Sequence, residues 1–400
     1  MRPQAVHNHE LLIIPAVTGV NVSPSTVRMD VKFHTGNIKL QHYWGGPMRV
    51  VMLEGETNQL FSGGALYERS DIPYEVAFST VDDLPSHLAG ADVLLTNADL
   101  HHLLPLPHQA QQQNIPCVSI YEYTLETRLQ INMVAKESLL RRLKGALWNL
   151  RMEPVRRASL RASTGVQFNG TPASDNYGAI TSNSIVFFDT RLSETNQGTI
   201  EEMTNRAERI NAGAPLQIAF SGRFEPMKGS DQLIPMAAAL KNAQCNAHLH
   251  LFGEGSLDEQ MREEVATLDL HDYVTFHGSI RFEDELVPFL RQNIDLFTCP
   301  HPQSDPSCTY LETFGCGIPI IGTQNDAFAG LMRRADAGWL VPLGKPNAMA
   351  ERVIALDQDR SAIHPKAAAA LAFARDNSFE KTMARRADHL QSILAVNASP

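Results

Sequence analysis

The chain has 400 residues and a formal net charge of −10 at pH 7, with 43% hydrophobic and 20% charged residues. Its length favours two domains over a single core, and its acidity argues against general binding to nucleic acid. No stretch approaches the roughly 18 apolar residues that a membrane-spanning helix needs.

The first half of the chain predicts a sheet less regularly than the second half does. Residues 27–43 predict an added hairpin that turns at Thr35-Gly36-Asn37. After it, short apolar runs predict strands over 48–53, 74–78, 93–96, 117–120, 165–168 and 185–188. We therefore expect a Rossmann-like domain over residues 1–205, in which 1–45 supply the extra strands.

The second half alternates regularly between short apolar runs and helical patterns. Strands are predicted over 215–220, 247–252, 273–276, 294–298, 318–321 and 339–341, with helices between them. This alternation indicates a parallel sheet covered on both faces, so that residues 206–376 form a second Rossmann-like domain. The polar stretch Arg191 to Gly213 contains the domain boundary, and residues 377–400 predict an amphipathic helix that packs back on the first domain.

The loop after the first strand of the second domain carries two cations. Arg223 and Lys228 lie five positions apart, and they offer phosphate oxygens a bidentate fork and a point charge. Gly222 and Gly229 let the backbone approach a ligand closely. Gly253, after the next strand, lies in another glycine turn and is a donor-binding candidate, for which the alternative is an ordinary turn. Because ligands bind beyond the carboxyl ends of parallel strands, the loop predicts a diphosphate site. The alternative is a surface turn with two solvated cations.

A second loop, which leads to Glu312, lies about 80 residues further along the chain. Glu312 stands at the start of a predicted helix and can accept hydrogen bonds from a pair of ribose hydroxyls. The amides of Ser307, Cys308 and Thr309 can hold phosphate oxygens. The alternative for Glu312 is an acid that only stabilises the helix dipole. Since both loops follow strands of one sheet, together they indicate a nucleotide-sugar site.

Residues 215–345 resemble the donor domain of the retaining glycosyltransferases of family four, the group-1 type with a GT-B fold. The matching motifs are Gly222-Arg223 with Lys228-Gly229, Phe252-Gly253 with Gly255, Val274 with Phe276 and Gly278, and Leu311-Glu312 with Cys316-Gly317-Ile318-Pro319. The resemblance implies that Arg223 and Lys228 hold the donor diphosphate and that Glu312 binds the ribose. It also implies two domains whose parallel sheets face each other across a cleft, the first of which binds the acceptor.

One position departs from the family pattern. The family has a further Glu eight positions before Glu312, near the donor sugar, where this chain has Ser304 followed by Asp305. We interpret Asp305 as a shifted carboxylate with a catalytic role, and we regard Ser304 as a donor-binding candidate. Asn325, after the next predicted strand, is a further residue that can face the sugar.

The acceptor side of the predicted site has one candidate. The strand over 117–120 is followed by Glu122 and Tyr123, either of which takes the place where many family members have a His. A carboxylate there can orient or deprotonate an acceptor hydroxyl, which makes Glu122 a catalytic candidate. The alternative is an acid in a polar loop at the end of a strand.

A basic segment in the first half interrupts the acidic chain. Between Lys136 and Arg161 there are eight basic residues and two acidic ones, and the predicted contact with an anionic membrane or a lipid-linked acceptor involves Arg141, Arg142 and Lys144. An apolar stripe follows helical spacing through the same segment: Leu139, Leu140, Leu143, Leu147, Trp148 and Leu150. The alternative is a stripe that faces the core and a solvated cationic face.

These features favour a glycosyltransferase that moves a sugar from a UDP- or GDP-linked donor to a saccharide or lipid-linked acceptor. The family resemblance implies that transfer is metal-independent and proceeds with retention. Polysaccharide or glycolipid assembly is the expected setting. The alternative is a non-catalytic nucleotide-sugar-binding protein, which the missing Glu favours. An epimerase of the same fold has no support, because this sequence shows no pair of cleft carboxylates together with a His. No signal-peptide pattern and five cysteines without close pairs predict a cytoplasmic protein, peripheral on the membrane at most.

Overall fold

The computed structural model describes residues 7–57, 64–134 and 138–397. The chain forms two compact units: the first unit comprises residues 1–125, 147–187 and 380–400, and the second comprises 126–146 and 188–379. The change between them at Phe187 and Phe188 comes earlier than the predicted boundary at 205 and 206. The reason is that the segment after Phe188 packs on the second unit, where the Phe188 ring contacts Phe373 at 5.3 Å between centroids.

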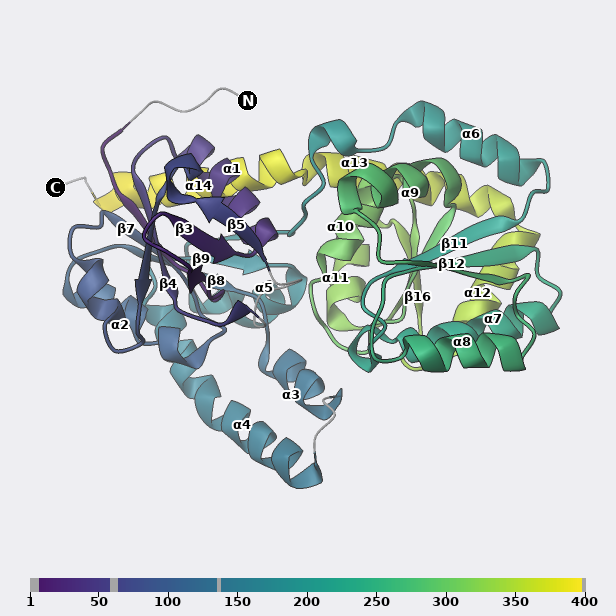
Figure 1. The fold of residues 1–400 in the computed structure, drawn as a ribbon, viewed down its shortest axis with the longest axis horizontal. Helices are drawn as coiled ribbons and strands as arrows, with labels where there is room; N and C mark the ends of the chain where they lie inside the picture. Colours follow the sequence, from purple (N-terminus) through teal and green to yellow (C-terminus); the bar gives the residue numbers. More distant parts are fainter. Residues whose placement is uncertain (1–6, 58–63, 135–137, 398–400) are drawn as a thin grey trace. The chain divides into compact units, whose positions relative to one another are not determined.

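The first unit is built on a seven-stranded sheet with the order β10-β9-β8-β7-β1-β4-β6, in which every pair of neighbours is parallel (Figure 1). Its strands are β1 (Leu11–Ile14), β4 (Met48–Leu53), β6 (Glu75–Ser79), β7 (Val93–Asn97), β8 (Cys117–Tyr121), β9 (Gly165–Asn169) and β10 (Ser184–Phe187). The six predicted strands of this sheet are confirmed to within a residue or two. Sequence analysis missed β1, whose four apolar residues lie between β4 and β7 and are at most 4% exposed.

Antiparallel strands are present near the N-terminus, but the predicted hairpin within 27–43 is wrong. Three short strands, β2 (Val20–Asn21), β3 (Thr26–Met29) and β5 (Ala65–Glu68), form a separate sheet. The turn predicted at Thr35-Gly36-Asn37 lies inside helix α1 (Val31–Trp44). The helix begins where the Asp30 carboxylate accepts a hydrogen bond from the backbone of Phe33, and it ends at Gly45, which has φ of 76°.

The C-terminal helix α14 (Phe379–Asn397) packs on the first unit, as predicted. Arg386 Nε donates to Gln167 Oε1 on β9 at 2.8 Å, and Gln391 Nε2 donates to the carbonyl oxygen of Trp44 at 2.9 Å. The other helices of this unit are α2 (Leu106–Gln112), α5 (Thr171–Tyr177) and the second half of α4 (Leu139–Ala162). Helix α14 therefore follows the second unit in the sequence but packs on β9 and α1 of the first unit.

The second unit contains a six-stranded parallel sheet with the order β13-β12-β11-β14-β15-β16, which confirms the second Rossmann-like domain (Figure 1). Its strands are β11 (Leu216–Ser221), β12 (Ala247–Phe252), β13 (Val274–Gly278), β14 (Leu296–Cys299), β15 (Ile320–Thr323) and β16 (Gly338–Val341). Its helices are α3 (Leu125–Val134), α6 (Ile200–Asn211), α7 (Leu233–Asn242), α8 (Asp258–Thr267), α9 (Val287–Asn293), α10 (Cys308–Gly315), α11 (Asp326–Ala335), α12 (Pro346–Gln358) and α13 (Ile363–Asp376). Buried apolar side chains from α7, α8 and α12, such as Met236, Met261 and Val353, pack in one core with β11 and β12.

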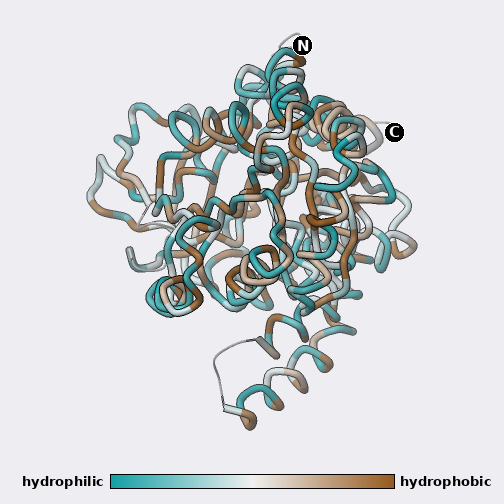
Figure 2. Tube along the Cα trace, turned by 90° about the vertical axis from the view of Figure 1, so that its right-hand side faces the viewer, coloured by the Kyte–Doolittle hydropathy of each residue, from teal (hydrophilic) through white to brown (hydrophobic). Residues whose placement is uncertain are grey.

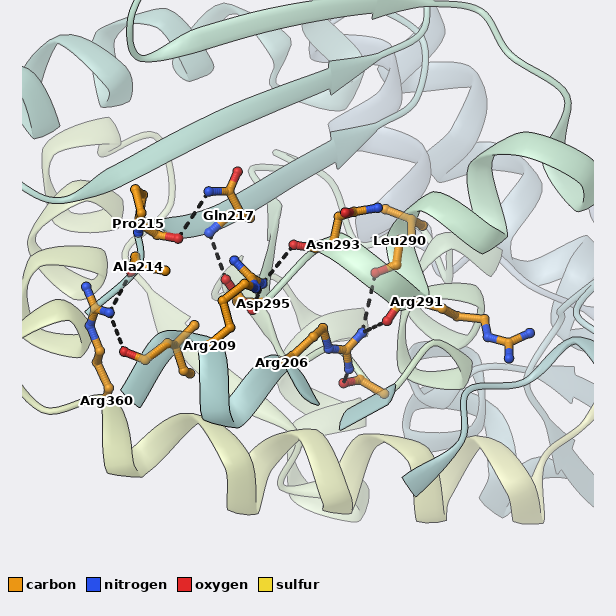
Figure 3. A network of polar contacts seen from close by, with 12 residues as sticks. Arg206, Arg209, Ala214, Pro215, Gln217, Leu290, Arg291, Asn293, Asp295 and Arg360 are labelled. Carbon is orange, nitrogen blue, oxygen red and sulfur yellow. Dashed lines mark hydrogen bonds and ion pairs between the residues drawn. The ribbon is translucent and has the colours of Figure 1, made fainter. Parts of the chain in front are cut away.

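A network of arginines on α6 fixes the helices behind this sheet (Figure 3). The Arg206 guanidinium donates to the carbonyl oxygen of Arg291 at 2.7 Å, near the end of α9, and to that of Gly317 at 2.5 Å, just after α10. Arg209 donates to the Asp295 carboxylate at 2.6 Å, and Asp295 also accepts the backbone N–H of Gln217 on β11. A cation at a helix C-terminus satisfies carbonyls that lack partners within the helix. The network therefore holds α10 in a fixed position relative to the sheet.

Candidate functional site

Three loops meet at the carboxyl end of the second sheet. The loop after β11 is joined to the loop after β12, because the Phe224 N–H donates to the Glu254 carbonyl at 3.0 Å. The loop after β12 is joined to the end of β13 in the same way, by Gly253 N–H and the Gly278 carbonyl at 2.8 Å. The Glu225 carboxylate also accepts hydrogen bonds from the backbone and the hydroxyl of Ser256. Backbone bonds of this kind hold the loops at the edge where parallel sheets bind ligands.

Two glycines bring these backbones together. Gly229 has φ of +69°, and a Cβ atom there would lie 2.0 Å from the carbonyl oxygen of Pro300. Gly253 has φ of +128°, and its Cβ would lie 2.0 Å from the carbonyl oxygen of Gly222. A side chain at either position would clash with backbone and require a conformation that other residues rarely adopt. Gly229 thus places Lys228 beside the chain that follows β14.

The structure brings Lys228 and Asp305 into direct contact. Lys228 Nζ lies 3.1 Å from Asp305 Oδ2, and the two side chains are 16% and 15% exposed. Arg223, by contrast, is exposed, and its guanidinium lies 3.6 Å from the sulfur of Met227. An anion that approaches this loop therefore meets one open guanidinium and one ammonium that already shares its charge with a carboxylate.

Glu312 lies one turn inside its helix rather than at the start. The helix α10 begins at Cys308, so Glu312 is the fifth residue and is 7% exposed. The favourable effect of the helix dipole on acids is confined to the first turn. This position therefore argues against the alternative that Glu312 only stabilises the helix dipole. Its carboxylate instead accepts two hydrogen bonds from Arg191, at 2.8 Å from Nε and 3.3 Å from Nη2.

Ser304 and Asn325 both help to begin helix α11. The Ser304 hydroxyl, which is fully buried, accepts the backbone N–H of Asp326 at 3.0 Å. Asn325 is the N-cap residue, whose side-chain oxygen accepts the backbone N–H of Phe328 and whose amide donates to the carbonyl of His301 at 3.1 Å. These hydrogen bonds give both side chains a structural task at the predicted sugar position.

The first residues of α10 lie beside this segment. Ser307 is the residue before the helix, and its hydroxyl donates to the Thr309 hydroxyl at 3.2 Å. Ser307, Cys308 and Thr309 are all half-buried. The N–H groups that open a helix have no partner inside it, so this end of α10 presents donors at the edge of the sheet.

Several residues of this region had no recognisable sequence signal. Gln130 on α3 accepts the backbone N–H of Ser304 at 2.8 Å, although α3 is 174 positions earlier in the chain. His301 is fully buried, and burial together with the nearby Lys228 ammonium holds its pKa well below the ordinary value. Arg191 lies in the polar stretch that was expected to hold only the domain boundary. A single Gln, His or Arg outside a motif cannot be assigned to a site from one sequence.

Glu122 lies in the first unit, immediately after β8. The Asp99 carboxylate accepts the backbone N–H groups of Glu122 and Tyr123, both at 3.1 Å. Arg156 donates to the Asp99 carbonyl at 3.3 Å. The loop that carries Glu122 is therefore fixed by its backbone, and the side chain itself is half-buried.

The basic segment forms the long helix α4, and its apolar stripe is exposed. Leu139, Leu143, Leu147 and Leu150 are 75%, 68%, 57% and 51% exposed, and Trp148 is 50% exposed. Figure 2 shows hydrophobic and hydrophilic residues alternating along this helix, at the bottom of the view. The stripe does not face a core in this structure. Lys136, where the predicted segment begins, lies outside the described residues.

Helix α3 covers a different side of α4. A Cβ atom on Gly145 would lie 2.3 Å from Asn132 Oδ1, and Asn132 Nδ2 donates to the carbonyl oxygen of Arg142 at 2.6 Å. At 100° per residue, Gly145 and Arg142 lie away from the stripe of leucines. Within the described residues, no helix is long and apolar enough to cross a membrane.

The rest of the described chain adds two facts about chemistry. No group of three or more His, Cys, Asp or Glu residues in the described ranges is arranged to hold a metal ion. All five cysteines are free thiols, and Cys308 is the most accessible of them because the other four are buried.

Comparison with known proteins gives one family match. Residues 215–359 match the family described as glycosyl transferases group 1. The curated relatives include the amylovoran biosynthesis glycosyltransferase AmsK of Erwinia amylovora, 24% identical over 46% of this chain and 46% of the relative. The phosphatidyl-myo-inositol mannosyltransferase of Mycobacterium leprae is 26% identical over 35% of this chain and 36% of the relative. The matched part thus spans less than half the length of these relatives.

Solved structures share the fold over nearly the whole chain. Anabaena HepE in complex with UDP has a TM-score of 0.65 and 15% identity, covering 96% of this chain and 99% of that one. Sucrose-phosphate synthase from Thermosynechococcus elongatus has a TM-score of 0.66 and 15% identity, covering 98% and 100%. With the two parallel sheets and the returning helix α14, these likenesses establish the GT-B fold predicted from the sequence.

Proposed function

We propose that the chain transfers a sugar from a nucleoside diphosphate to an acceptor hydroxyl, because residues 215–359 match the group-1 glycosyltransferase family. The observation that carries the proposal is the ion pair of Lys228, after β11, with Asp305, after β14, at the carboxyl edge of the second sheet. Curated relatives named for amylovoran, colanic acid and lipopolysaccharide core biosynthesis support a role in polysaccharide or glycolipid assembly.

The donor is proposed to be a UDP- or GDP-linked sugar. Arg223 and Lys228 bind the diphosphate, the opening amides of α10 at Ser307, Cys308 and Thr309 add donors, and Glu312 binds the ribose. The titles of the Anabaena structures name UDP, UDP with glucose, and UDP-glucose as ligands of that protein, which supports a donor of this class here.

Transfer is proposed to proceed with retention and without a metal ion. As the bond from the sugar to the diphosphate breaks, negative charge grows on the leaving phosphate, and preorganised cations and N–H groups stabilise it. Asp305 Oδ2 lies 3.1 Å from Lys228 Nζ, and this contact supports the proposal that Asp305 acts on the donor sugar beside the phosphate. Glu122, in the first unit, is proposed to act on the acceptor hydroxyl.

The acceptor is proposed to be a saccharide or a lipid-linked saccharide, reached from an anionic membrane surface at the cytoplasmic face. Helix α4 supports this, because its exposed leucines run along one side and Arg141, Arg142, Lys144 and Arg151 accompany them. From Ser138 to Met152 the segment has no acidic residue. Apolar insertion and attraction between basic residues and anionic lipids act together in helices of this kind.

The second candidate function is binding of a nucleotide sugar without transfer. The hydrogen bonds of Ser304 and Asn325 to the start of α11 favour it, because two of the residues predicted near the sugar are engaged in local structure. If Asp305 does not replace the missing carboxylate, the donor site remains but the reaction does not.

A panel of nucleotide sugars tested by thermal shift identifies the donor, since a ligand at 100 times its Kd adds about 2.7 kcal/mol of stability. The identified donor is then incubated with saccharide and lipid-linked acceptors. Release of nucleoside diphosphate that depends on the acceptor supports transfer. Binding without acceptor-dependent release supports the second candidate, and stabilisation by no nucleotide overturns both.

A further inference from the structure

Arg191, four residues after the end of β10, is joined to the proposed ribose-binding carboxylate. Its guanidinium donates to both oxygens of Glu312, at 2.8 and 3.3 Å. The same guanidinium lies over the ring of Phe282, 4.0 Å from the centroid. Phe282 follows β13, so three separate parts of the second unit meet at this ion pair.

The segment that carries Arg191 is fixed against helix α10. Leu192 is 2% exposed, and a Cβ atom on Gly315 would lie 2.2 Å from Leu192 Cδ2. Gly315 is three positions after Glu312, so the two residues share one side of α10. Thr190, on the other side of Arg191, is 4% exposed, and its hydroxyl accepts the backbone N–H of Leu192. The position of Arg191 is therefore set by buried neighbours and not only by its charge.

The geometry of the ion pair leaves Glu312 able to bind further donors. A carboxylate has about four lone-pair sites on its two oxygens. The Arg191 fork occupies one site on each oxygen and fixes the plane of the group, which leaves the other sites for two neighbouring hydroxyls. The Glu312 side chain is 9% exposed, whereas that of Arg191 is 37% exposed, so the carboxylate depends on this cation for much of its charge compensation.

We propose that Arg191 is a positioning residue for ribose recognition, which holds the Glu312 carboxylate in the orientation that receives the 2′- and 3′-hydroxyls of the donor nucleotide. This inference rests on the proposed function, because it assumes that the nucleoside diphosphate lies at this end of the sheet. It assigns to the segment that follows β10 a part in selecting ribonucleotides.

The test compares nucleotides with and without the ribose hydroxyls. The affinities of UDP and GDP and of their 2′,3′-dideoxy counterparts are measured by calorimetry for the wild type and for Arg191→Ala, Arg191→Lys and Glu312→Gln. Charge-assisted hydrogen bonds predict that the wild type prefers the ribonucleotide by about tenfold or more. Arg191→Ala is expected to lose most of this preference and to bind the dideoxy nucleotide as the wild type does. Arg191→Lys, which lacks the planar fork, is expected to restore only part of the preference.

A matched control is Arg262→Ala. Arg262 also pairs with a carboxylate, Asp258 at 2.7 Å, and also lies over a phenylalanine ring, that of Phe276 at 4.3 Å. Its replacement should leave the preference for ribonucleotides unchanged. The double variant Arg191→Ala, Glu312→Gln should show no greater loss of preference than Glu312→Gln alone, because the arginine acts through the carboxylate.

Each of the other outcomes contradicts a particular step of the inference or of the proposed function. If Arg191→Ala weakens both forms of the nucleotide equally, Arg191 does not act through the ribose and the inference is wrong. If the variant binds the ribonucleotide more tightly, Arg191 competes with the ligand instead of preparing its site. If the wild type binds both forms equally, Glu312 is not the ribose ligand although nucleotide binding stands. If the wild type binds neither, the proposed function itself fails.

Discussion

The ion pair between Lys228 and Asp305 predicts opposite effects on nucleoside diphosphate affinity when one or the other partner is replaced. In the proposed function the nucleoside diphosphate binds the Lys228 ammonium, but in this structure Lys228 Nζ lies 3.1 Å from Asp305 Oδ2. Removing the cation with Lys228→Ala should weaken binding of UDP or GDP. Removing only the competing charge with Asp305→Asn should tighten it, although the same change should lower the rate of sugar transfer.

The magnitudes follow from the geometry of the pair. Because both side chains are about 15% exposed, the pair should lie near the upper end of values for accessible ion pairs, about 1 kcal/mol. Asp305→Asn should therefore tighten nucleoside diphosphate binding about fivefold. Lys228→Ala removes a charge-assisted hydrogen bond of roughly 1.5 to 3 kcal/mol, so that affinity should fall by about two- to thirtyfold after roughly 1 kcal/mol of competition is subtracted.

Titration calorimetry of the two single variants and the double variant measures both effects. In the Lys228→Ala background, Asp305→Asn should no longer tighten binding by releasing the ammonium. Lys241→Ala is the matched control, since Lys241 in the last turn of α7 pairs with Asp269 at the same 3.1 Å. This variant should bind the nucleoside diphosphate as tightly as the wild type does. Weaker binding by Asp305→Asn, or an unchanged titration of Lys228→Ala, would refute the assignment of this pair to the phosphate site.

Three further predictions concern the ribose, the membrane and pH. Glu312→Gln should weaken nucleoside diphosphate binding by about tenfold without a change in fold, and equal affinities by calorimetry would contradict it. Replacing Arg141, Arg142 and Lys144 with Gln should lower sedimentation with anionic vesicles by more than an order of magnitude at low salt, at about 1 kcal/mol per basic residue, and should leave donor affinity intact. A control variant that replaces the exposed Arg333, Lys345 and Arg352 with Gln should sediment with anionic vesicles as the wild type does. If the wild type does not bind anionic vesicles at low salt, the membrane proposal is wrong. Burial, with the neighbouring His248 and His277, lowers the pKa of His250 to about 4; its contribution to stability is therefore complete above about pH 6.5 and lost as pH falls toward 4. The two pKa values imply about 2 kcal/mol between pH 7 and pH 5, which solvent screening of this partly exposed ring reduces to about 1 kcal/mol. The free energy of unfolding of His250→Gln should fall by that much less than that of the wild type, and parallel curves would show that His250 does not titrate in this range.

Most of the fold could be predicted because parallel strands are continuous apolar runs between turns. Strands β4 and β12 were predicted to the residue, and the helices between the later strands followed from their spacing. The strand β1 (Leu11–Ile14) was missed, because its place in the sheet depends on pairing with β4 and β7, which lie further along the chain. The expected hairpin at 27–43 failed for another reason: the caps at Asp30 and Gly45 stabilise a helix around Gly36.

The candidate site could be predicted where its residues follow strands in a fixed pattern. Arg223, Lys228 and Glu312 come from such loops, and the structure places all three in the second unit. Their partners could not be predicted, because Arg191 and Gln130 reach the site from distant segments without any motif. The exposure of the leucines on α4 could not be predicted either, because an apolar helical stripe has the same sequence pattern whether it faces a core or solvent.

Transfer of a labelled sugar tests the central claim most directly. The nucleotide sugar that stabilises the protein most is prepared with label in its sugar and incubated with saccharide and lipid-linked acceptors. The account predicts that label enters the acceptor in an amount equal to the nucleoside diphosphate released, and that Arg223→Ala and Lys228→Ala reduce both together. Label that stays on the nucleotide in the presence of every acceptor, while binding is intact, would contradict a transferase and leave a nucleotide-sugar-binding protein.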